Sequence, residues 1–273
     1  MERSILCFDI DGTLITDDPS RHLPDSAKVA VRRAKQAGHL TFINTGRVMV
    51  NVDDFIRDVG FDGYICGCGT YINYQGNVLL HHQLTAKQCV KTAYLLRECG
   101  IFGLYEAADA NAYDCRVYER YAAIPGICEL IAYFESLGKH FETDIESDAF
   151  HFDKFSAWFD HHADMKRFRQ EIAGEFDYID RGSDFCEIVP KGYSKATGIQ
   201  FLMDYFHVPW ERTYAFGDST NDLPMLEFVK HSVVMNGGDS RVKAAAEYVT
   251  GSVEQDGLYQ AIAHYGLISE DRN

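Results

Sequence analysis

The chain has 273 residues, 46% of them hydrophobic and 25% charged, which is the balance of an ordinary folded protein. Its formal net charge of −15 disfavours nucleic acid and anionic membrane surfaces as partners, because like charges repel over about 8–10 Å at physiological salt. No stretch approaches the roughly 18 apolar residues of a membrane span, the start shows no signal peptide, and the 8 cysteines form no CxxC pair. We therefore expect a cytoplasmic protein with reduced thiols.

The first part of the chain alternates apolar runs with helical patterns. It predicts strands over residues 4–8, 40–43 and 64–66, helices over 27–37 and 48–59, and a hairpin over 70–80. Strands that alternate with helices in this way indicate a parallel sheet with helices on both faces.

The pattern changes after residue 80 and returns near residue 194. The middle region predicts helices over residues 86–99, 126–137 and 163–176, and strands over 101–105, 156–160, 178–180 and 185–189. The last region predicts helices over 195–206, 222–229 and 258–265, and strands over 213–216 and 232–235. We predict an α/β protein: a doubly wound parallel-sheet core of residues 1–80 and 191–273, with an inserted α/β domain of residues 81–190.

Two aspartates follow the first predicted strand directly, in the segment Asp9-Ile10-Asp11-Gly12-Thr13. Alternate side chains of an extended backbone point the same way, so the two carboxylates would meet on one side. They would repel each other unless a cation or a proton intervenes, an arrangement that suits nucleophilic and acid–base catalysis. A strand that ends in an Asp-Gly turn explains the same residues, and this segment alone leaves both interpretations open.

Two more predicted strands end in polar residues. Thr45 and Gly46 follow the second strand, where a hydroxyl and backbone N–H groups at a helix start bind phosphate oxygens well. Asp218, Asn221 and Asp222 follow the strand at 213–216, and Mg²⁺ takes carboxylate oxygens of this kind as ligands. Ordinary helix capping explains each segment when it is taken alone.

Lys195 opens a predicted helix, where the helix dipole disfavours a cation. A solvated surface lysine is the ordinary explanation for such a residue. However, ligands of a doubly wound sheet bind outside the carboxyl ends of its strands, where the three polar segments fall. We therefore expect those segments and Lys195 to converge on one site.

In their residues and their order, these segments resemble the motifs of the haloacid dehalogenase superfamily. Within it they resemble the Cof-type phosphatases of subclass IIB, which carry a large inserted α/β cap. DIDGTL resembles the first motif of the family, TGR the second, KGYSKATGIQFL the third and GDSTNDLPML the fourth. The segment HSVVMNGGDSRVKAAAEYVTGSVEQDGL is similar to the family's usual ending, so the resemblance covers nearly the whole chain.

The resemblance implies a Mg²⁺-dependent phosphoric monoester hydrolase that acts on a small phosphorylated metabolite, such as a sugar phosphate or a phosphorylated cofactor. Asp9 would be the nucleophile and would form an aspartyl-phosphate. Asp11 would protonate the leaving oxygen and then activate the hydrolytic water. The implied metal site comprises Asp9, Asp11 (through its backbone carbonyl), Asp218 and Asp222, and the implied phosphate site comprises Thr45, Gly46, Lys195 and Asn221.

The inserted region would be the cap, which closes over the site and selects the leaving group. Arg47 beside the phosphate site, and Arg116 and Lys154 in the cap, are candidates for substrate contacts. The chain departs from the family pattern at Cys68-Gly69, where members commonly carry Asn-Gly, but this touches no catalytic position.

Two alternatives stay open at this point. A phosphomutase of the same superfamily shares the aspartyl-phosphate step, and a non-catalytic regulator could bind a phosphometabolite on the same fold, since fold alone does not establish activity. We expect a monomer or a small homo-oligomer.

Overall fold

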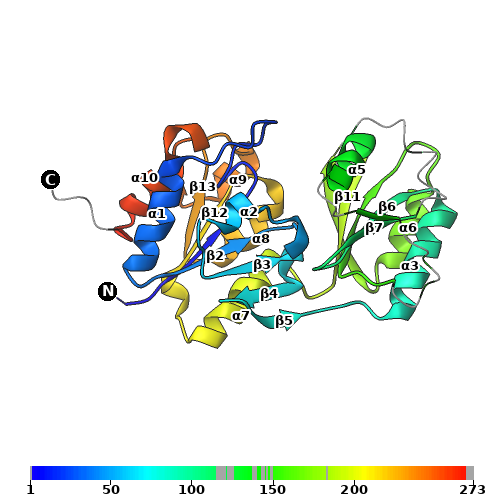
Figure 1. Ribbon diagram of the computed structural model, residues 1–273, viewed down its shortest axis with the longest axis horizontal. Helices are drawn as coiled ribbons and strands as arrows, with labels where there is room; N and C mark the ends of the chain where they lie inside the picture. The colour runs from blue at the N-terminus through cyan, green and yellow to red at the C-terminus, as the bar shows by residue number, and fades with distance from the viewer. Residues whose placement is uncertain are drawn as a thin grey trace. The chain divides into compact units, whose positions relative to one another are not determined.

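The strands form two sheets, one in each of two compact units of the chain (Figure 1). The computed structural model describes residues 2–114, 121, 126–136, 140–142, 145, 147, 150–182 and 184–268. The first unit comprises Met1–Arg47, Val52–Leu80 and Tyr193–Asn273, and the second comprises Val48–Asn51 and His81–Gly192. The sheet of the first unit thus takes its strands from both ends of the chain.

The sheet of the first unit is parallel at its centre. Its strands are β1 (Ile5–Phe8), β2 (Leu40–Asn44), β3 (Gly63–Cys66), β4 (Tyr71–Tyr74), β5 (Asn77–His81), β12 (Thr213–Gly217), β13 (His231–Val234) and β14 (Tyr248–Val249). Among the described residues the order is β14-β13-β12-β1-β2-β3-β4-β5, with parallel pairing from β14 to β3. On one side of β1 the strands follow in chain order from β2 to β5, and on the other side from β12 to β14. This confirms the predicted doubly wound α/β fold, and the topological switch point lies between β1 and β12.

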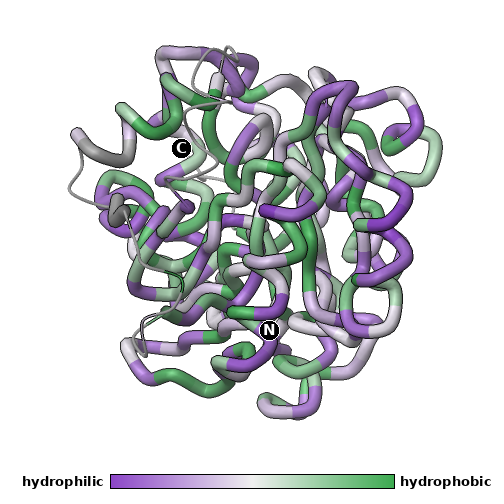
Figure 2. Tube along the Cα trace, turned by 90° about the vertical axis from the view of Figure 1, so that its right-hand side faces the viewer, coloured by the Kyte–Doolittle hydropathy of each residue, from purple (hydrophilic) through white to green (hydrophobic). Residues whose placement is uncertain are grey.

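Helices cover both faces of this sheet. They are α1 (Asp25–Gln36), α2 (Asp54–Arg57), α7 (Lys195–Phe206), α8 (Leu223–Phe228), α9 (Ser240–Ala245) and α10 (Gly257–His264), with 3₁₀ turns η2 (Gly67–Gly69), η3 (Trp210–Arg212), η4 (Thr220–Asp222) and η5 (Val253–Gln255). Ile5 and Cys7 of β1 pack with residues of α7, α8 and α9. Leu6 and Phe8 are buried on the opposite face, where α1 lies beside α10 (Figure 1). Figure 2, in which the right-hand side of Figure 1 faces the viewer, shows helical turns that carry both hydrophilic and hydrophobic residues, as expected for helices with one buried face.

The second unit is also a sheet with helices on both faces. Its elements are η1 (Met49–Asn51), α3 (Ala86–Cys99), β6 (Phe102–Glu106), β7 (Asn111–Tyr113), α5 (Ile127–Ser136), β8 (His140–Glu142), β9 (Lys154–Trp158), α6 (Met165–Ile172), β10 (Phe176–Gly182) and β11 (Phe185–Pro190). The strand order in the described part is β10-β11-β9-β6-β7-β8. Phe155 and Ala157 of β9 pack with α3 and α6. Leu104 packs with α5 and pairs with Ser156, so Ser156 points to the α5 side of the sheet.

One predicted helix is wrong. Residues 48–59 contain the short turn η1 and the four-residue helix α2, which are separated by Val52 and Asp53. The extended backbone of Asp53 (φ −68°, ψ 151°) interrupts the helix. The predicted hairpin is confirmed: β4 and β5 flank Gln75 and Gly76, and both residues have the positive φ that a tight two-residue turn requires (48° and 82°). The short elements β7, β8, β14 and α9 were not predicted, because so few residues show no periodicity.

Candidate active site

The carboxyl ends of three neighbouring strands place Asp9, Thr45 and Asp218 at one edge of the first unit's sheet. β1 pairs in parallel with both β12 and β2, so the residues that follow these strands lie next to one another. The backbone N–H of Asp9 donates to the carbonyl of Phe216 at 3.0 Å, which extends the pairing of β1 and β12 to the first residue of the site. The site therefore lies at the topological switch point.

A tight turn follows Asp9. The carbonyl of Ile10 accepts the N–H groups of Leu14 and Ile15 at 2.9 and 3.0 Å, which closes the turn. Gly12 has φ +73°, and a Cβ atom there would lie 2.4 Å from Oδ2 of Asp218. Only glycine leaves room for that carboxylate, so the Gly of the Asp-Gly turn is required by the site as well as by the backbone.

Lys195 is buried between two carboxylates of the site. Its Nζ donates to Oδ1 of Asp9 and to Oδ1 of Asp222, both at 2.6 Å. Ser194 caps α7 by accepting the N–H of Thr197 at 3.2 Å. This cap fixes the start of the helix and with it the position of the lysine. Lys195 is only 2% exposed, so the solvated-lysine explanation is wrong.

Asp222 organises the loop after β12. Its Oδ2 accepts the backbone N–H groups of Asp218 and Ser219 at 3.0 and 3.1 Å, while its Oδ1 accepts from Lys195. The hydroxyl of Ser219 donates to Oδ1 of Asn221 at 2.5 Å. Asp222 is fully buried. Its hydrogen bonds join the loop after β12 to Lys195, and Lys195 in turn joins it to Asp9.

The charges of this group do not balance. Burial raises the pKa of Asp9 well above its usual value, Asp222 raises it further, and Lys195 opposes the rise. Burial and the charge of Asp222 raise the pKa of Asp218 to about 7. Burial also disfavours the charge on Lys195, but Asp222 and Asp9 outweigh it and the pKa of Lys195 is raised. The surplus of negative charge makes a further cation favourable here.

The donor atoms fit a hard divalent cation. Carboxylate oxygens of Asp9, Asp218 and Asp222 lie within 4.8 Å of one another, the one such group in the part of the chain that the structure describes. Mg²⁺ prefers oxygen ligands and is commonly held by one or two carboxylates with waters and substrate phosphate. Oδ1 of Asp218 accepts a long hydrogen bond from the hydroxyl of Thr13, at 3.3 Å. The side chain of Asp11 lies outside this carboxylate group.

The carboxylate of Asp11 is bound by Arg47 instead. Nε of Arg47 donates to Oδ2 of Asp11 at 2.9 Å, and Nη2 donates to Oδ1. The remaining nitrogen, Nη1, donates to Oδ2 of Asp53 at 3.0 Å, and Arg21 donates to the same oxygen at 2.6 Å. Sequence reasoning identified Asp11 and Arg47 as site residues but missed Asp53 and Arg21, which no motif marks.

The loop after β2 carries Thr45 and Gly46. Thr45 is buried, and its Oγ1 accepts the backbone N–H of Arg47 at 3.2 Å. The turn η2 braces this loop, since the N–H groups of Gly67 and Cys68 donate to the carbonyls of Arg47 and Thr45 at 2.8 and 3.1 Å. Cys68, at the position that departs from the family pattern, has φ +55°, a conformation that Asn adopts more readily than most residues.

Asn44 is a further residue that sequence reasoning missed. Its Nδ2 donates to the carbonyl of Lys195 at 3.0 Å, which ties β2 to the start of α7. The side chain is fully buried and its Oδ1 has no hydrogen-bond partner among the described residues. The signal in the sequence was an amide at the end of a buried strand, directly before Thr45.

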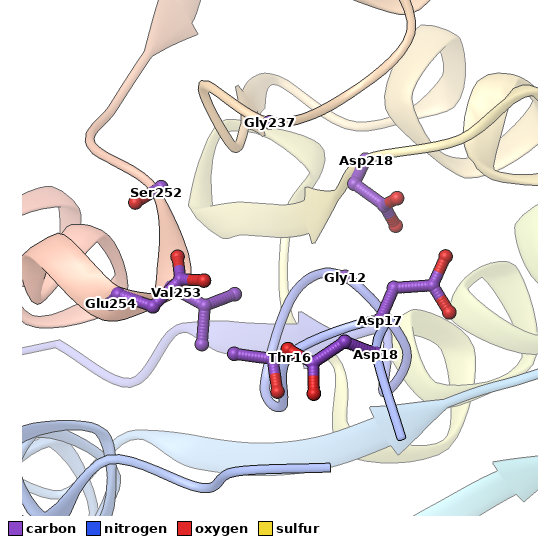
Figure 3. Close-up of a pocket in the computed structure, with 9 residues that line it drawn as sticks. All are labelled: Gly12, Thr16, Asp17, Asp18, Asp218, Gly237, Ser252, Val253 and Glu254. Carbon is purple, nitrogen blue, oxygen red and sulfur yellow. The ribbon is translucent and has the colours of Figure 1, made fainter. Parts of the chain in front are cut away.

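A cavity of about 310 Å³ lies beside the Gly12 turn. Figure 3 shows Asp218, Gly12 and Asp17 on one side of it and Ser252, Val253 and Glu254 on the other. Its lining is acidic, which extends the negative potential of the site toward solvent.

The inserted region contains two substrate-contact candidates, and the structure describes one of them. Lys154 lies in β9 of the second unit, buried, with Nζ 3.0 Å from Oε2 of Glu106 and 3.3 Å from Oε2 of Glu187. Arg116 lies outside the described residues.

Comparison with known proteins identifies the class to which this chain belongs. Residues 6–262 match the model of the haloacid dehalogenase-like hydrolases, and the chain is a member of that family. It is 26% identical to the Bacillus subtilis protein YkrA over 98% of this chain and 100% of YkrA. It is 28% identical to the pyridoxal phosphate phosphatase YbhA of Escherichia coli, over 96% of this chain and 98% of YbhA.

A solved structure agrees with this result. BT1666 of Bacteroides thetaiotaomicron, described as a phosphatase of the same superfamily, is 26% identical and superposes with a TM-score of 0.81 over 97% of this chain and 96% of its own. The predicted family and the predicted enzyme class, a phosphoric monoester hydrolase, are confirmed. No helix within the described residues is long and apolar enough to cross a membrane.

Proposed function

We propose that this protein is a Mg²⁺-dependent phosphatase that hydrolyses a small phosphorylated metabolite through an aspartyl-phosphate on Asp9. The observation that carries the proposal is the buried group of Asp9, Lys195, Asp218 and Asp222 at the switch point of the sheet, with an excess of negative charge. Such a site attracts a divalent cation, and the cation with Lys195 offsets the negative charge of a bound phosphoryl group.

In the first step, an Oδ of Asp9 attacks phosphorus and the bond from phosphorus to the leaving oxygen breaks. Asp11 gives that oxygen a proton, so the leaving group departs as an alcohol. Lys195, whose Nζ already lies 2.6 Å from Asp9, would bind a phosphoryl oxygen, as would the hydroxyl of Thr45 and the N–H of Gly46. Asn221 would complete the phosphate site from the loop after β12.

In the second step, Asp11 accepts a proton from a water molecule as that water attacks phosphorus. The bond between phosphorus and the Asp9 oxygen breaks, which releases phosphate and restores the carboxylate. Asp9, the carbonyl of Asp11 and Asp218 would hold Mg²⁺, with Asp222 in support. The ion would orient the phosphoryl group and neutralise its charge.

The substrate is a small phosphorylated metabolite, a sugar phosphate or a phosphorylated cofactor. The similarity to YbhA, a pyridoxal phosphate phosphatase, supports the second of these. We further propose that residues 81–190 act as the cap over a catalytic core of residues 1–80 and 191–273, in a cytoplasmic protein.

The test is phosphate release from a panel of sugar phosphates, pyridoxal phosphate and flavin mononucleotide, with Mg²⁺ and with a chelator. Release that needs Mg²⁺ supports the proposal, and the order of substrates defines the preferred class. Isomerised sugar phosphate without free phosphate would identify a phosphomutase instead. Binding without turnover of any compound would identify a non-catalytic regulator.

A further inference from the structure

Hydrogen bonds join four alternating charges of the first unit, beginning at the proposed proton donor Asp11, whose side chain is 43% exposed. They run in the order Asp11, Arg47, Asp53, Arg21. Nη1 of Arg47 and Nη2 of Arg21 both donate to Oδ2 of Asp53, at 3.0 and 2.6 Å. The side chain of Asp53 is only 12% exposed, and those of Arg47 and Arg21 are 21% and 27% exposed. Interactions shielded to this degree are screened less by salt than those of a surface ion pair.

The carboxylate of Asp53 does not cap α2, the helix that begins at the next residue. Asp53 stands at the N-cap of α2, where an aspartate commonly accepts a backbone N–H of the helix, yet its side chain makes no capping hydrogen bond. The carboxylate is turned to the two guanidinium groups instead. A four-residue helix without its cap bond is less stable. The Asp53 carboxylate thus binds the two arginines at some cost to the stability of α2.

Arg21 is itself held in place. It lies in the loop between Thr16 and His22, which is closed by the N–H of Thr16 donating to the carbonyl of His22 at 3.0 Å and the N–H of His22 donating to Oγ1 of Thr16 at 2.9 Å. Arg21 has φ +46°, an uncommon conformation for a residue other than glycine. Its guanidinium lies 5.8 Å from the ring centre of Phe55. The loop thus presents Arg21 to α2.

We propose that Asp53 is a positioning residue for Asp11 that acts through Arg47 and is supported by Arg21. This inference rests on the proposed function. A guanidinium is a rigid plane, so anchoring Nη1 on Asp53 fixes the direction in which Nε and Nη2 meet Asp11. A carboxylate has about four acceptor positions, and Arg47 takes two, which leaves Asp11 free to face the leaving oxygen.

Asp53→Asn tests the inference because it keeps the shape of the side chain and removes its charge. We expect kcat for a hexose phosphate or pyridoxal phosphate, whose leaving oxygen needs a proton, to fall about tenfold or more, with KM changed less, as misplacement of a catalytic group predicts. With para-nitrophenyl phosphate the burst of nitrophenolate, which reports formation of the phosphoenzyme, should slow by under about threefold, because nitrophenolate departs without a proton. Hydrolysis of the phosphoenzyme uses Asp11 as a base whatever the substrate, so steady-state turnover should still fall about tenfold. This difference between the two steps is a result that general loss of structure does not produce.

Asp54→Asn is the matched control, since it removes the same charge one residue away from an exposed position. It should leave both activities unchanged. Arg21→Gln should give the same selective loss as Asp53→Asn at smaller size, and it serves as the second variant if Asp53→Asn does not fold. Equal losses in the nitrophenolate burst and in steady-state turnover, a change in KM alone, or no loss beyond that of the control would overturn the inference. Absence of phosphate release by the wild-type protein would overturn the proposed function and this inference with it.

Discussion

Each unit of the chain buries a lysine between two carboxylates, and the surroundings of the two lysines differ. In the first unit, Nζ of Lys195 lies 2.6 Å from both Asp9 and Asp222. The carboxylates stand in loops beyond strand ends, and Asp218 adds a further acid beside them. The pKa of Asp218 is raised to about 7 by burial and by Asp222, so this group carries more negative charge than its one lysine offsets.

In the second unit, Lys154 lies within strand β9, between Glu106 of β6 and Glu187 of β11. Here a second cation is present: Nε of Arg181 lies 3.4 Å from Oε1 of Glu187. The hydroxyl of Ser156 donates to Oε2 of Glu106 at 2.7 Å. These four charges balance, and they join adjacent strands of one sheet.

The comparison shows how two buried charge groups of similar composition are suited to different tasks. A balanced group inside a sheet satisfies its own members and fixes strand positions. An unbalanced group at strand ends leaves charge to be met by a ligand or an ion, and perturbed groups of that kind are typical of functional sites. The comparison predicts that variants of the first group change activity and variants of the second change stability.

Replacement of the nucleophile has the largest expected effect. Asp9→Asn should lower phosphate release by at least about 1000-fold, because the amide cannot form the phosphoenzyme, while the change in volume is small. Steady-state phosphate release with Mg²⁺, beside Asp54→Asn as the control for charge, measures it. Activity within tenfold of the wild type would show that the unbalanced group is not the reacting one.

Removal of each lysine contrasts the two groups directly. Lys195→Met should lower phosphate release by about 100-fold or more, since a bound phosphoryl group loses its cation. Lys154→Met should lower the free energy of unfolding by about 3–5 kcal/mol, because Glu106 and Glu187 stay buried after losing the positive charge that lies between them. Steady-state kinetics measure phosphate release by both variants, and urea unfolding measures their free energies of unfolding. A raised KM in a fully stable Lys154→Met protein would instead support the predicted substrate contact of Lys154.

The pH dependence of stability reports the charge surplus. Because the folded pKa of Asp218 is raised to about 7, the folded state binds more protons than the unfolded state between about pH 4 and 7. The contribution of Asp218 to the free energy of unfolding should therefore fall as pH rises through that window and level off above it. The difference in urea midpoint between wild type and Asp218→Asn, measured without metal, isolates this contribution.

Added Mg²⁺ should reverse the trend. The metal binds the ionised carboxylates, so it should stabilise the wild type more at pH 8 than at pH 5, and stabilise Asp218→Asn less at either pH. Equal stabilisation of the two proteins would remove Asp218 from the metal site.

Ser156→Ala has the smallest expected effect. It removes one hydrogen bond to Glu106, which keeps Lys154 as a partner, so the free energy of unfolding should fall by about 1–2 kcal/mol. The kcat of the folded variant should not change. A decrease in kcat without loss of stability would contradict the structural role of the balanced group.

The sequence predicts the place of a site residue where that residue directly follows an apolar strand of the doubly wound sheet. Asp9 and Asp218 follow apolar strands that the structure pairs, and a doubly wound sheet necessarily brings such strand ends together. The predicted helix at 48–59 was wrong, because Asp53 has an extended backbone and its carboxylate accepts from Arg47, six residues earlier, and from Arg21, 32 residues earlier.

The support around the site was not predictable for a related reason. Asp53 stands 42 residues after Asp11, and their link through Arg47 depends on tertiary packing that leaves no periodic signal. Asn44 has no motif either, and its contact with Lys195 crosses 151 residues of sequence. The balanced group in the second unit likewise depends on strand register, which the sequence alone does not specify.

The most direct test of the account is to trap the phosphoenzyme. Wild-type protein is mixed with substrate and Mg²⁺, quenched within a turnover in acid, treated with borohydride to reduce the acyl phosphate, and analysed by peptide mass spectrometry. The account predicts a reduced aspartate at Asp9, absent from Asp9→Asn and from samples without Mg²⁺. Modification at another residue, or turnover with Asp9 unmodified throughout, would contradict it.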